Sequence, residues 1–439
     1  MIRLFEWLTQ ESLDLHYSLE ESGIHGTSIV LNDDGFLPEG IISPYTFFCE
    51  VEMDGSPLYF NQLEVPYLWQ ITGTNTEGEI WNRSSKRGVI HYHEPKYLRF
   101  VQSVDWLYPD GSIYMTDHYN KYGWVFARTY FFSDQQVSHK KYYTKSGQEV
   151  LSENILTGDI LLNWKGKVYH FTKKVDFFLF YFKKSGLDLS SIWYNSLGMP
   201  FLISYYLGGE GRDILFWQEN LADQLPGNMQ IIFSGRTSRT KKVIVQDRSV
   251  YKKLLHLVEE KNKEMISFLN IIYPKLRENY SRKEILIVTN SDQIEGVETL
   301  TDNLSAYTFH IGALTSMSDK LQNIGQKENV LLYPNMSPKT MLDLLEQCDI
   351  YLDINHGNEV LSIVRLAFER SLLILAYDNT VHSPIFHHES GIFNHSKPQT
   401  LSDWLLNLDD YSQTVSCWRS DLFPMTYRDY KQVLVSNVD

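Results

Sequence analysis

Apolar residues are grouped in two different ways along this chain. In the second half, short continuous apolar runs alternate with stretches of helical spacing. The runs are residues 285–289, 307–314, 329–333, 349–354 and 372–376. Strands that alternate with helices are typical of right-handed crossovers and of a doubly wound parallel sheet. The pattern predicts a Rossmann-like domain over residues 236–439, led by a helix at about 249–269.

Helix starts can be located within this predicted domain. Ser337 precedes Pro338, and a serine N-cap with proline in the first turn is typical of a helix N-terminus. Asn358 stands where it can cap a further helix that runs to Glu369. We therefore expect a helix after each of the strands that end near residues 333 and 354.

Between residues 51 and 182 the pattern is different. Apolar and polar residues alternate, as at residues 124–131, and turn signals such as Asp110-Gly111 separate the stretches. Closely spaced strands with tight turns indicate an antiparallel meander. This region is therefore predicted to be a β-rich insertion of about 130 residues, far longer than an ordinary connection.

The segments on both sides of the insertion return to an α/β pattern. A short strand at residues 28–31 ends at Asp33-Asp34-Gly35, and further apolar runs are expected to be strands. These runs are residues 199–204, 213–217 and 229–233. Residues 1–50 and 183–235 are accordingly predicted to form an N-terminal Rossmann-like domain that the insertion at 51–182 interrupts.

Composition excludes several classes of function. The chain has 439 residues, 43% hydrophobic residues and a formal net charge of −14, so it is globular and poorly suited to bind nucleic acid. Three distant cysteines fit neither a disulfide framework nor a zinc site and indicate a reducing compartment. The apolar runs are too short to span a membrane, and the N-terminus lacks a secretory signal. We expect a cytoplasmic protein.

Ligands of doubly wound sheets bind at the carboxyl ends of the strands, so polar residues there are the first candidates. Asp33 and Asp34 follow one predicted strand, and His356, Asn358 and Glu359 follow another. These residue types also dominate helix caps and turns. Capping and ligand binding therefore remain alternatives for all five residues.

Other motifs carry little chemistry. Gly208-Gly209-Glu210-Gly211 lacks the further glycine of a dinucleotide fingerprint and the ending of a P-loop, so it indicates a turn. Two histidine clusters, at residues 91–94 and 387–389, lack a third ligand at recognisable spacing. A G-x-S-x-G nucleophile elbow is also missing. We therefore predict no catalytic residue, no metal site and no cofactor.

Several segments are similar to one known family. They are residues 33–38, 43–45, 285–293, 333–335 and 348–359. These segments resemble the glycosyltransferase-stabilising proteins of the accessory Sec system of Gram-positive bacteria. The resemblance covers essentially the whole chain. It implies an α/β fold with two Rossmann-like domains of the GT-B glycosyltransferase type, with the antiparallel β-rich insertion in the N-terminal domain.

The resemblance also implies a lost catalytic site. Active retaining relatives carry an Arg and a Lys after the first strand of the C-terminal domain, and two glutamates eight residues apart near the fourth strand. Here Asp292 stands where a cation is needed, and the position eight residues after Glu359 is Ala367, next to Leu366. A leaving diphosphate would lack the charge-assisted hydrogen bonds that stabilise it.

Members of this family pair with a catalytic subunit, which transfers N-acetylglucosamine from its UDP donor to serine-rich repeat adhesins before export. By resemblance we expect a non-catalytic subunit that stabilises this transferase, helps to bind the serine-rich acceptor polypeptide, and lies in the cytoplasm or peripherally at the inner face of the cell membrane. Candidate residues of an acceptor cleft are His356, Asn358, Glu359, Asp33 and Asp34.

Aromatic residues on the insertion are the candidates for contact with the catalytic partner. They are Trp124, Phe126, Tyr130 and Phe132. Two other hypotheses stay open: an active glycosyltransferase with an atypical donor site, and a free-standing protein that binds peptide or carbohydrate. Turnover of the donor by the isolated chain would identify an active glycosyltransferase. Co-purification with a partner would distinguish a subunit from a free-standing binding protein.

Overall fold

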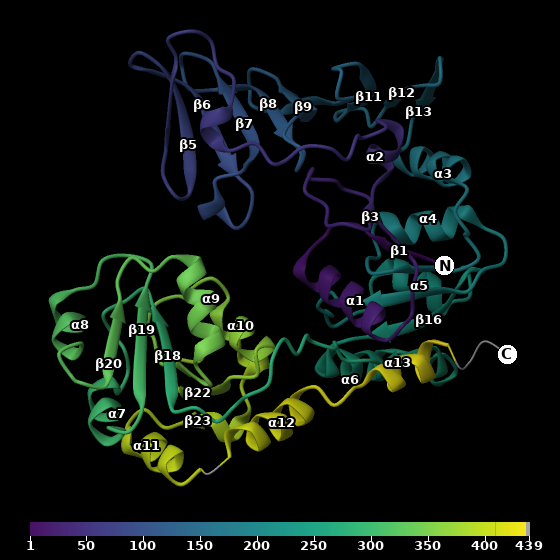
Figure 1. Ribbon diagram of the computed structural model, residues 1–439. Coiled ribbons are helices and arrows are strands. Elements are labelled where there is room, and N and C mark those ends of the chain that lie inside the picture. Colours follow the sequence, from purple (N-terminus) through teal and green to yellow (C-terminus); the bar gives the residue numbers. More distant parts are fainter. Residues whose placement is uncertain (409, 436–439) are drawn as a thin grey trace. The chain divides into compact units, whose positions relative to one another are not determined.

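The computed structural model describes residues 1–408 and 410–435 (Figure 1). The chain divides into two compact units. The first unit contains Met1–Leu269 and the last residues from Val433 onward, and the second contains Asn270–Gln432. Helix α13 (Tyr427–Leu434) includes the second boundary.

A parallel sheet of seven strands forms the centre of the first unit. Its strands are β1 (Ile2–Phe5), β2 (Thr27–Val30), β3 (Ile41–Ile42), β14 (Ile192–Tyr194), β15 (Asp213–Trp217), β16 (Thr240–Val245) and β17 (Ile266–Phe268). Their spatial order is β17-β16-β15-β14-β1-β2-β3. This is the strand order of a doubly wound fold, in which the direction of winding changes between β1 and β14.

Six helices accompany this sheet. They are α1 (Gln10–Glu21), α2 (Pro44–Phe48), α3 (Lys174–Ser185), α4 (Met199–Leu207), α5 (Gly227–Phe233) and α6 (Arg248–Leu257), with the 3-10 turn η3 (Glu260–Met265). Buried side chains of α3, α4 and α5, including Phe177, Phe201 and Met229, form one core with β1, β14 and β15. This core also includes side chains from the antiparallel part of the unit, so the two sheets of the first unit are packed together.

The antiparallel part is a ten-stranded meander in which every strand pairs with its neighbours in sequence. Its strands are β4 (Gln70–Gly73), β5 (Glu77–Asn82), β6 (Ser85–Tyr92), β7 (Val101–Leu107), β8 (Ile113–Tyr119), β9 (Val125–Phe131), β10 (Val137–Tyr143), β11 (Glu149–Asn154), β12 (Ile160–Trp164) and β13 (Lys167–Phe171), with the 3-10 turns η1 (Phe60–Gln62) and η2 (Lys96–Leu98). It is inserted between β3 and β14, where the doubly wound sheet changes direction. Figure 1 shows it in blue beside the parallel sheet of the same unit.

The two halves of the meander pack into two different hydrophobic cores. In β10 to β12, Tyr142, Leu151 and Leu162 pack into the core of the parallel sheet. In β5 to β7, Ile80 and Val104 belong to a second cluster, which is covered by side chains from residues 58–71. One face of β9 to β13 therefore remains at the surface.

The second unit is built on a parallel sheet of six strands. These are β18 (Glu284–Thr289), β19 (Thr308–Ala313), β20 (Val330–Tyr333), β21 (Ile350–Asp353), β22 (Leu373–Tyr377) and β23 (Ile392–Phe393), in the spatial order β20-β19-β18-β21-β22-β23. Alternate residues of β18 enter two different cores, Ile285 in one and Leu286 in the other. Burial on both faces explains why this strand is a continuous apolar run.

Helices lie on both faces of the six-stranded sheet. They are α7 (Val297–Asn303), α8 (Asp319–Ile324), α9 (Pro338–Gln347), α10 (Ile363–Glu369), α11 (Gln399–Leu406) and α12 (Tyr411–Leu422), with the 3-10 turns η4 (Pro384–Phe386) and η5 (Glu389–Gly391). As predicted, Ser337 caps α9, because its side chain accepts a hydrogen bond from the Thr340 N–H. The fold class expected from the sequence is confirmed.

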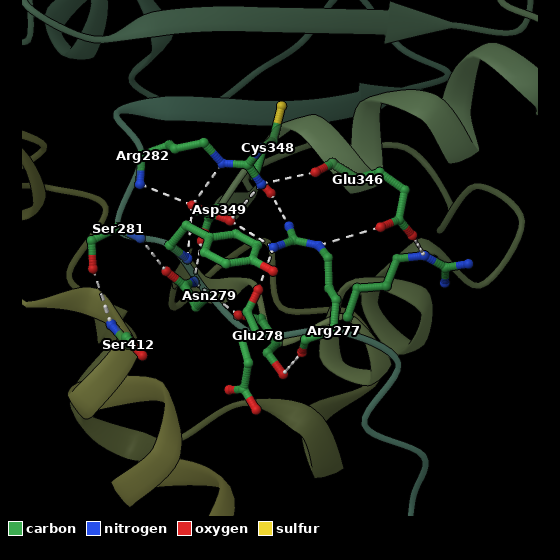
Figure 2. A network of polar contacts seen from close by, with 12 residues as sticks. Arg277, Glu278, Asn279, Ser281, Arg282, Glu346, Cys348, Asp349 and Ser412 are labelled. Atoms are coloured by element: carbon green, nitrogen blue, oxygen red, sulfur yellow. Dashed lines mark hydrogen bonds and ion pairs between the residues drawn. The ribbon is translucent and has the colours of Figure 1, made fainter.

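A buried carboxylate anchors the start of the second unit. Figure 2 shows Asp349, which is fully buried just before β21, between two arginines. Arg277 Nη1 donates to Asp349 Oδ1 at 2.7 Å, and Arg282 Nε donates to Oδ2 at 2.9 Å. Burial alone would raise the pKa of Asp349, but the bonds from these arginines lower it below its ordinary value. The segment that enters the unit is thereby fixed to the amino end of β21.

The boundary between the two parallel sheets differs from the one expected. The C-terminal domain was expected to begin at residue 236, but β16 and β17 pair in parallel with the first sheet and the unit ends at Leu269. The long helix expected at 249–269 ends at Leu257, because residues 266–268 extend and pair with β16. Apolar residues at 266–268 thus complete a sheet edge instead of a helix face.

Two runs that were expected to be strands are helices. Residues 199–204 belong to α4 and residues 229–233 to α5. Pro200 lies in the first turn of α4, a position that favours a helix start. In α5 the buried residues Met229, Ile232 and Phe233 lie three and four positions apart, on one helical face.

Candidate functional site

The first candidate site lies at the switch point of the second unit, where β18 and β21 end side by side. Thr289 closes β18, and its hydroxyl donates to the buried Asn355 Oδ1 at 2.7 Å. Asn355 Oδ1 also accepts from the Gly357 N–H at 3.0 Å. The loops that follow the two strands are thereby bound to each other at the position where doubly wound folds bind ligands.

Gly357 lies very close to the side chain of Asn290. A Cβ at position 357 would overlap the Asn290 Oδ1. Asn290 is the residue directly after β18, so the loop that follows β21 lies against the end of β18. The two loops therefore meet at the switch point.

Glu359 occupies the N-terminus of the helix that follows. Its Oε1 accepts the Val364 N–H at 3.1 Å, in the first turn of α10, and its Oε2 accepts the Ser383 hydroxyl at 2.7 Å. Free N–H groups at a helix start are the usual binding place for a phosphate. Here the chain's own carboxylate takes that place.

Asn358 does not cap this helix, contrary to expectation. Helix α10 begins at Ile363, with Ser362 before it. Asn358 is exposed, and its backbone C=O accepts from Asn355 Nδ2 at 3.2 Å. The residues between Asn358 and α10 therefore belong to the loop, and the Asn358 side chain contributes no cap.

His382 joins the loops after β21 and β22. Its Nδ1 lies 2.7 Å from Asp353 Oδ1 and its Nε2 lies 2.8 Å from the Gly357 O. Both ring nitrogens face acceptors, so the two contacts are satisfied together when the ring is an imidazolium. Burial would lower the pKa of His382, but the bond to Asp353 and its charge outweigh this effect and raise the pKa.

His356 is also paired within the unit. Its Nε2 lies 2.7 Å from Glu295 Oε2, which also accepts from Asn379 Nδ2 at 3.0 Å. His356, Asn358 and Glu359 are thus brought together at one edge of the sheet. His356 and Glu359 are held by partners within the unit, and Asn358 is held through its backbone.

The residues expected to replace a donor site are placed as follows. Asp292 is exposed in the loop after β18. Ala367 is fully buried in the core on one face of the sheet. Glu369 lies further along α10 and pairs with Arg365 Nε at 2.8 Å, so this glutamate is used within its own helix.

The second candidate site lies in the first unit. Asp33 follows β2 and is buried, and its Oδ2 accepts the Ser43 hydroxyl at 2.5 Å while Oδ1 accepts the Gly35 N–H at 2.8 Å. Burial raises the pKa of Asp33, and these two bonds lower it only in part. Asp34 is exposed and accepts the Phe36 N–H at 2.9 Å, as in a turn. Asp33 lines a pocket of about 530 Å³, and Asp34 is not among the residues that line it.

The four aromatic residues of the insertion do not share one face. Phe126 is buried in the core, where a register shift between His118 and Tyr119 makes it the extra residue of a bulge in β9. Trp124 packs against the same core. Tyr130 stacks on His139 with ring centroids 4.7 Å apart, and Phe132 is 43% exposed. Tyr130 and Phe132 are therefore the two that remain at the surface.

Two features of these sites were not found from the sequence. The pairing of Asp353 with His382 joins two residues that follow different strands, so no local motif indicates it. Asn120, which lines the pocket beside Asp33, lies in the turn between β8 and β9 of the meander. Only the folded chain brings this turn beside the loop after β2, so no spacing in the sequence indicates the contact.

The described residues contain no group of His, Cys, Asp or Glu side chains placed to hold a metal ion. Within residues 1–408 and 410–435, no helix is both long and apolar enough to cross a membrane.

Family models match almost the whole chain. They are described as the GtfB N-terminal domain at residues 2–48, the GtfB middle domain at 69–172, the GtfB third domain at 174–257 and the GftB/GlyA-F C-terminal domain at 285–417. A protein of Streptococcus parasanguinis named UDP-N-acetylglucosamine–peptide N-acetylglucosaminyltransferase stabilizing protein GtfB is 99% identical over 439 residues, which is 100% of both chains. This chain belongs to the GtfB family.

Solved structures agree with the family. A chain in the crystal structure of a GtfA/B complex bound to UDP and GlcNAc matches with a TM-score of 0.93 and 40% identity, over 99% of each chain. The pneumococcal O-GlcNAc transferase GtfA matches with a TM-score of 0.56 and 12% identity, over 98% of each chain. The second match shows that the GtfB fold is also that of a glycosyltransferase.

Proposed function

We propose that this GtfB family member is the non-catalytic subunit of a UDP-N-acetylglucosamine:polypeptide transferase and that it stabilises the catalytic subunit. The observation that carries the proposal is the full-length match to a protein named as a stabilizing protein of such a transferase. The match to a chain of a GtfA/B complex supports a hetero-oligomer. The partner is accordingly a GtfA-type transferase.

The geometry of the second unit supports the absence of catalysis. A donor diphosphate binds through cations and free N–H groups. Here Asp292 brings a negative charge to the loop after β18, and Glu359 accepts the Val364 N–H. Both groups would repel the donor.

Turnover by the isolated chain tests this part of the proposal. The purified chain, free of partner, should neither hydrolyse UDP-N-acetylglucosamine nor transfer its sugar to a serine-rich peptide. Asp292→Arg should not restore activity, because Glu359 still occupies the start of α10. Measurable turnover by the wild-type chain would instead support an active glycosyltransferase with an atypical donor site.

We place the partner interface on the outer face of β9 to β13, defined by Tyr130, Lys141 and Leu161. These residues lie on the side opposite Tyr142 and Leu162, which face the core. The outer face has a hollow of about 440 Å³ lined by side chains from β10 to β13. Together with the exposed Phe132, it offers both apolar and charged contacts for another protein.

Co-purification tests the interface. Tyr130→Glu or Phe132→Glu should leave the chain folded by circular dichroism, abolish co-purification with the catalytic subunit and lower the soluble yield of that subunit. Tyr206→Glu is the control, because Tyr206 is 58% exposed on α4 and lies outside the meander. If both meander variants retain full partner binding while the wild-type complex forms, the interface lies elsewhere. If the wild-type chain itself recovers no partner, a free-standing binding protein is the better account.

We further propose that the chain helps to hold the unglycosylated serine-rich acceptor, with Asp33 and Asp34 in the first unit and His356, Asn358 and Glu359 in the second as candidate contacts. A serine-rich segment offers backbone groups and hydroxyls but few large side chains, so binding should be weak per residue and multivalent. A pull-down with an unglycosylated serine-rich peptide tests this role, and failure of the chain to retain the peptide, alone and with its partner, contradicts it.

A cytoplasmic complex that attaches peripherally to the inner face of the cell membrane is part of the same proposal, and it rests on the family resemblance alone. Flotation of the purified complex with vesicles of anionic lipid tests the attachment. Complex that stays at the bottom of the gradient argues against it.

A further inference from the structure

The pocket beside Asp33 is the feature of the first unit that gives the proposed acceptor role a defined place. Its volume of about 530 Å³ is within the range of sites that bind small ligands or side chains. It lies past the carboxyl ends of β2 and β3, with the turn between β8 and β9 over it. Carboxyl ends of parallel strands are the usual ligand edge of such a fold.

The walls of this pocket are mainly aliphatic. The apolar lining residues are Leu37, Pro38, Ile41, Ile42, Val51 and Met53, with Tyr45, Cys49 and Phe126. Of the described residues that line it, Lys121 is the one cation, and its Nζ donates to the Leu37 O at 2.6 Å. Asp33 and Glu39 are the acidic lining residues. Such a lining attracts a branched apolar side chain and disfavours a phosphate.

Two polar groups stand out within the aliphatic lining. Asn120 is 3% exposed, and its Nδ2 has no hydrogen-bond partner among the described residues. Its Oδ1 is used, because it accepts the N–H groups of Tyr122 and Trp124 at 3.1 and 3.3 Å. The carboxylate of Asp33 has two bonds and retains lone pairs. A free donor and a free acceptor together match a peptide group, which carries one of each.

The pocket is also preformed. The Lys121 N–H donates to the Gly35 O at 2.8 Å, which joins the loop after β2 to the turn of the meander. A Cβ on Gly35 would lie 2.5 Å from the Tyr119 O, and its φ of +89° favours glycine. Because the wall of the pocket is already fixed, the protein loses little conformational entropy when a ligand binds, and little affinity is lost in this way.

We propose that this pocket binds an extended segment of the acceptor polypeptide by taking one of its aliphatic side chains, with a neighbouring peptide group bonded to Asn120 and Asp33. The inference rests on the proposed acceptor role and adds a defined site to it. The pocket would give the chain a sequence preference, which a segment made of serines alone could not satisfy. The pocket selects segments in which an aliphatic residue interrupts the serines.

Paired peptides test this preference. Two labelled serine-rich peptides that differ at one central position, valine or alanine, are titrated against the full chain and followed by fluorescence anisotropy. The valine peptide should bind about tenfold more tightly, as expected for burial of one aliphatic side chain. Equal affinities of the two peptides would overturn the proposal.

Two variants locate the effect. Val51→Phe fills the pocket, and Asn120→Asp keeps the Oδ1 that the turn needs while replacing the donor by an acceptor. Val51→Phe should reduce the tenfold preference to about twofold or less, whereas Asn120→Asp, which removes a donor to the peptide backbone, should weaken the binding of both peptides. Val435→Phe is the matched control, because it makes the same exchange at a residue that is 48% exposed directly after α13 and outside the meander, and it should keep the preference. If Val51→Phe keeps the preference, or if Asn120→Asp leaves the affinity of both peptides unchanged, the proposal fails.

Two further readouts separate this proposal from the proposed function. Circular dichroism and co-purification with the catalytic subunit should be unchanged in the variants, so a lost preference does not arise from unfolding or a lost partner. Free N-acetylglucosamine should not displace the valine peptide. Displacement by the sugar would identify a carbohydrate site and overturn the peptide assignment while leaving the partner-stabilising role intact.

Discussion

Both parallel sheets have the strand order of a doubly wound fold, yet their carboxyl edges use polar groups differently. In the second unit, Glu359 bonds to the start of α10, and His382 bonds to Asp353 and to the Gly357 O. In the first unit, Asp33 lines a pocket, and the Asn120 Nδ2 beside it has no hydrogen-bond partner among the residues that the structure describes. The edge that would bind a nucleotide sugar is occupied by the chain itself, while the other edge retains free binding groups.

This difference indicates how a glycosyltransferase fold can lose a donor site and still keep a pocket lined by polar groups. A few side chains suffice to occupy a phosphate site, because the groups that would bind the ligand are the same groups that bind each other. The strand order and the cores are unaffected, since they depend on the apolar runs. The variants below test each edge separately.

The largest effect is expected from removing the buried carboxylate of the second unit. Asp353 is 1% exposed and accepts from the N–H and the ring of His382. Asp353→Ala leaves these partly buried donors without their acceptor, so we expect a loss of about 3 kcal/mol in the free energy of unfolding. Urea denaturation measures the loss, and Asp353→Asn, which keeps one acceptor, should lose less. Equal losses for the two variants would show that the hydrogen bonds contribute little.

A slightly smaller effect is expected at the pocket of the first unit. In Gly35→Ala the new Cβ would lie 2.5 Å from the backbone O of Tyr119, and the residue would keep a φ of +89°. Strain and overlap together should cost about 2–3 kcal/mol. Gly111→Ala is the matched control, because Gly111 has a φ of +88° with nothing within 4 Å of its Cβ position. Thermal unfolding measures the loss of stability in both variants. An equal loss would show that the positive φ alone, and not the overlap with Tyr119, causes the cost.

His382 should give the second unit a stability that depends on pH. The pKa of His382 is raised in the folded chain above its ordinary value of 6.5, so its contribution is fully present below pH 6.5 and is lost as the pH rises through the folded pKa. Wild type should exceed His382→Gln by about 1–2 kcal/mol at pH 6 and by less at pH 9. Urea denaturation at both pH values checks this. A stability difference between wild type and variant that is the same at both pH values would contradict a charged His382 ring.

The smallest effect is expected at the close approach in the second unit. In Gly357→Ala the new Cβ meets the end of the Asn290 side chain, which is exposed and whose Oδ1 accepts a long hydrogen bond from Asn355 Nδ2 at 3.4 Å. The cost should be below about 1 kcal/mol, because a flexible side chain yields more easily than backbone. Asn290→Ala in the same chain should remove the cost. A loss in the double variant as large as in the single variant would show that the backbone, not Asn290, sets the limit.

The sequence predicted the fold better than the sites. Continuous apolar runs such as 285–289 identified strands that are buried on both faces, and the alternating region was correctly expected to be antiparallel. The runs at 199–204 and 229–233 were wrongly expected to be strands, because a short apolar run has the same appearance in a buried helix. Where tertiary packing decides between a helix and a strand, the pattern of apolar residues could not predict which one forms.

The candidate sites show the same limit. Asp33 was predicted from its place after a strand, but its neighbour Asn120 comes from a distant turn that only the folded chain brings close. Glu359 was predicted as a contact for a ligand, yet it bonds to Val364 and Ser383 of its own unit. Residue types and spacing indicate where polar groups gather, whereas only the geometry shows whether they remain free.

Hydrogen exchange of the chain in complex with its catalytic partner tests the central claim most directly. UDP-N-acetylglucosamine and an unglycosylated serine-rich peptide that contains valine are added in separate experiments. We predict that the nucleotide sugar leaves exchange at residues 289–295 and 353–364 unchanged, while the peptide slows exchange at residues 33–51 and 119–126. Protection of residues 289–295 or 353–364 by the nucleotide sugar would contradict the account, because it would show that the second unit still binds a donor.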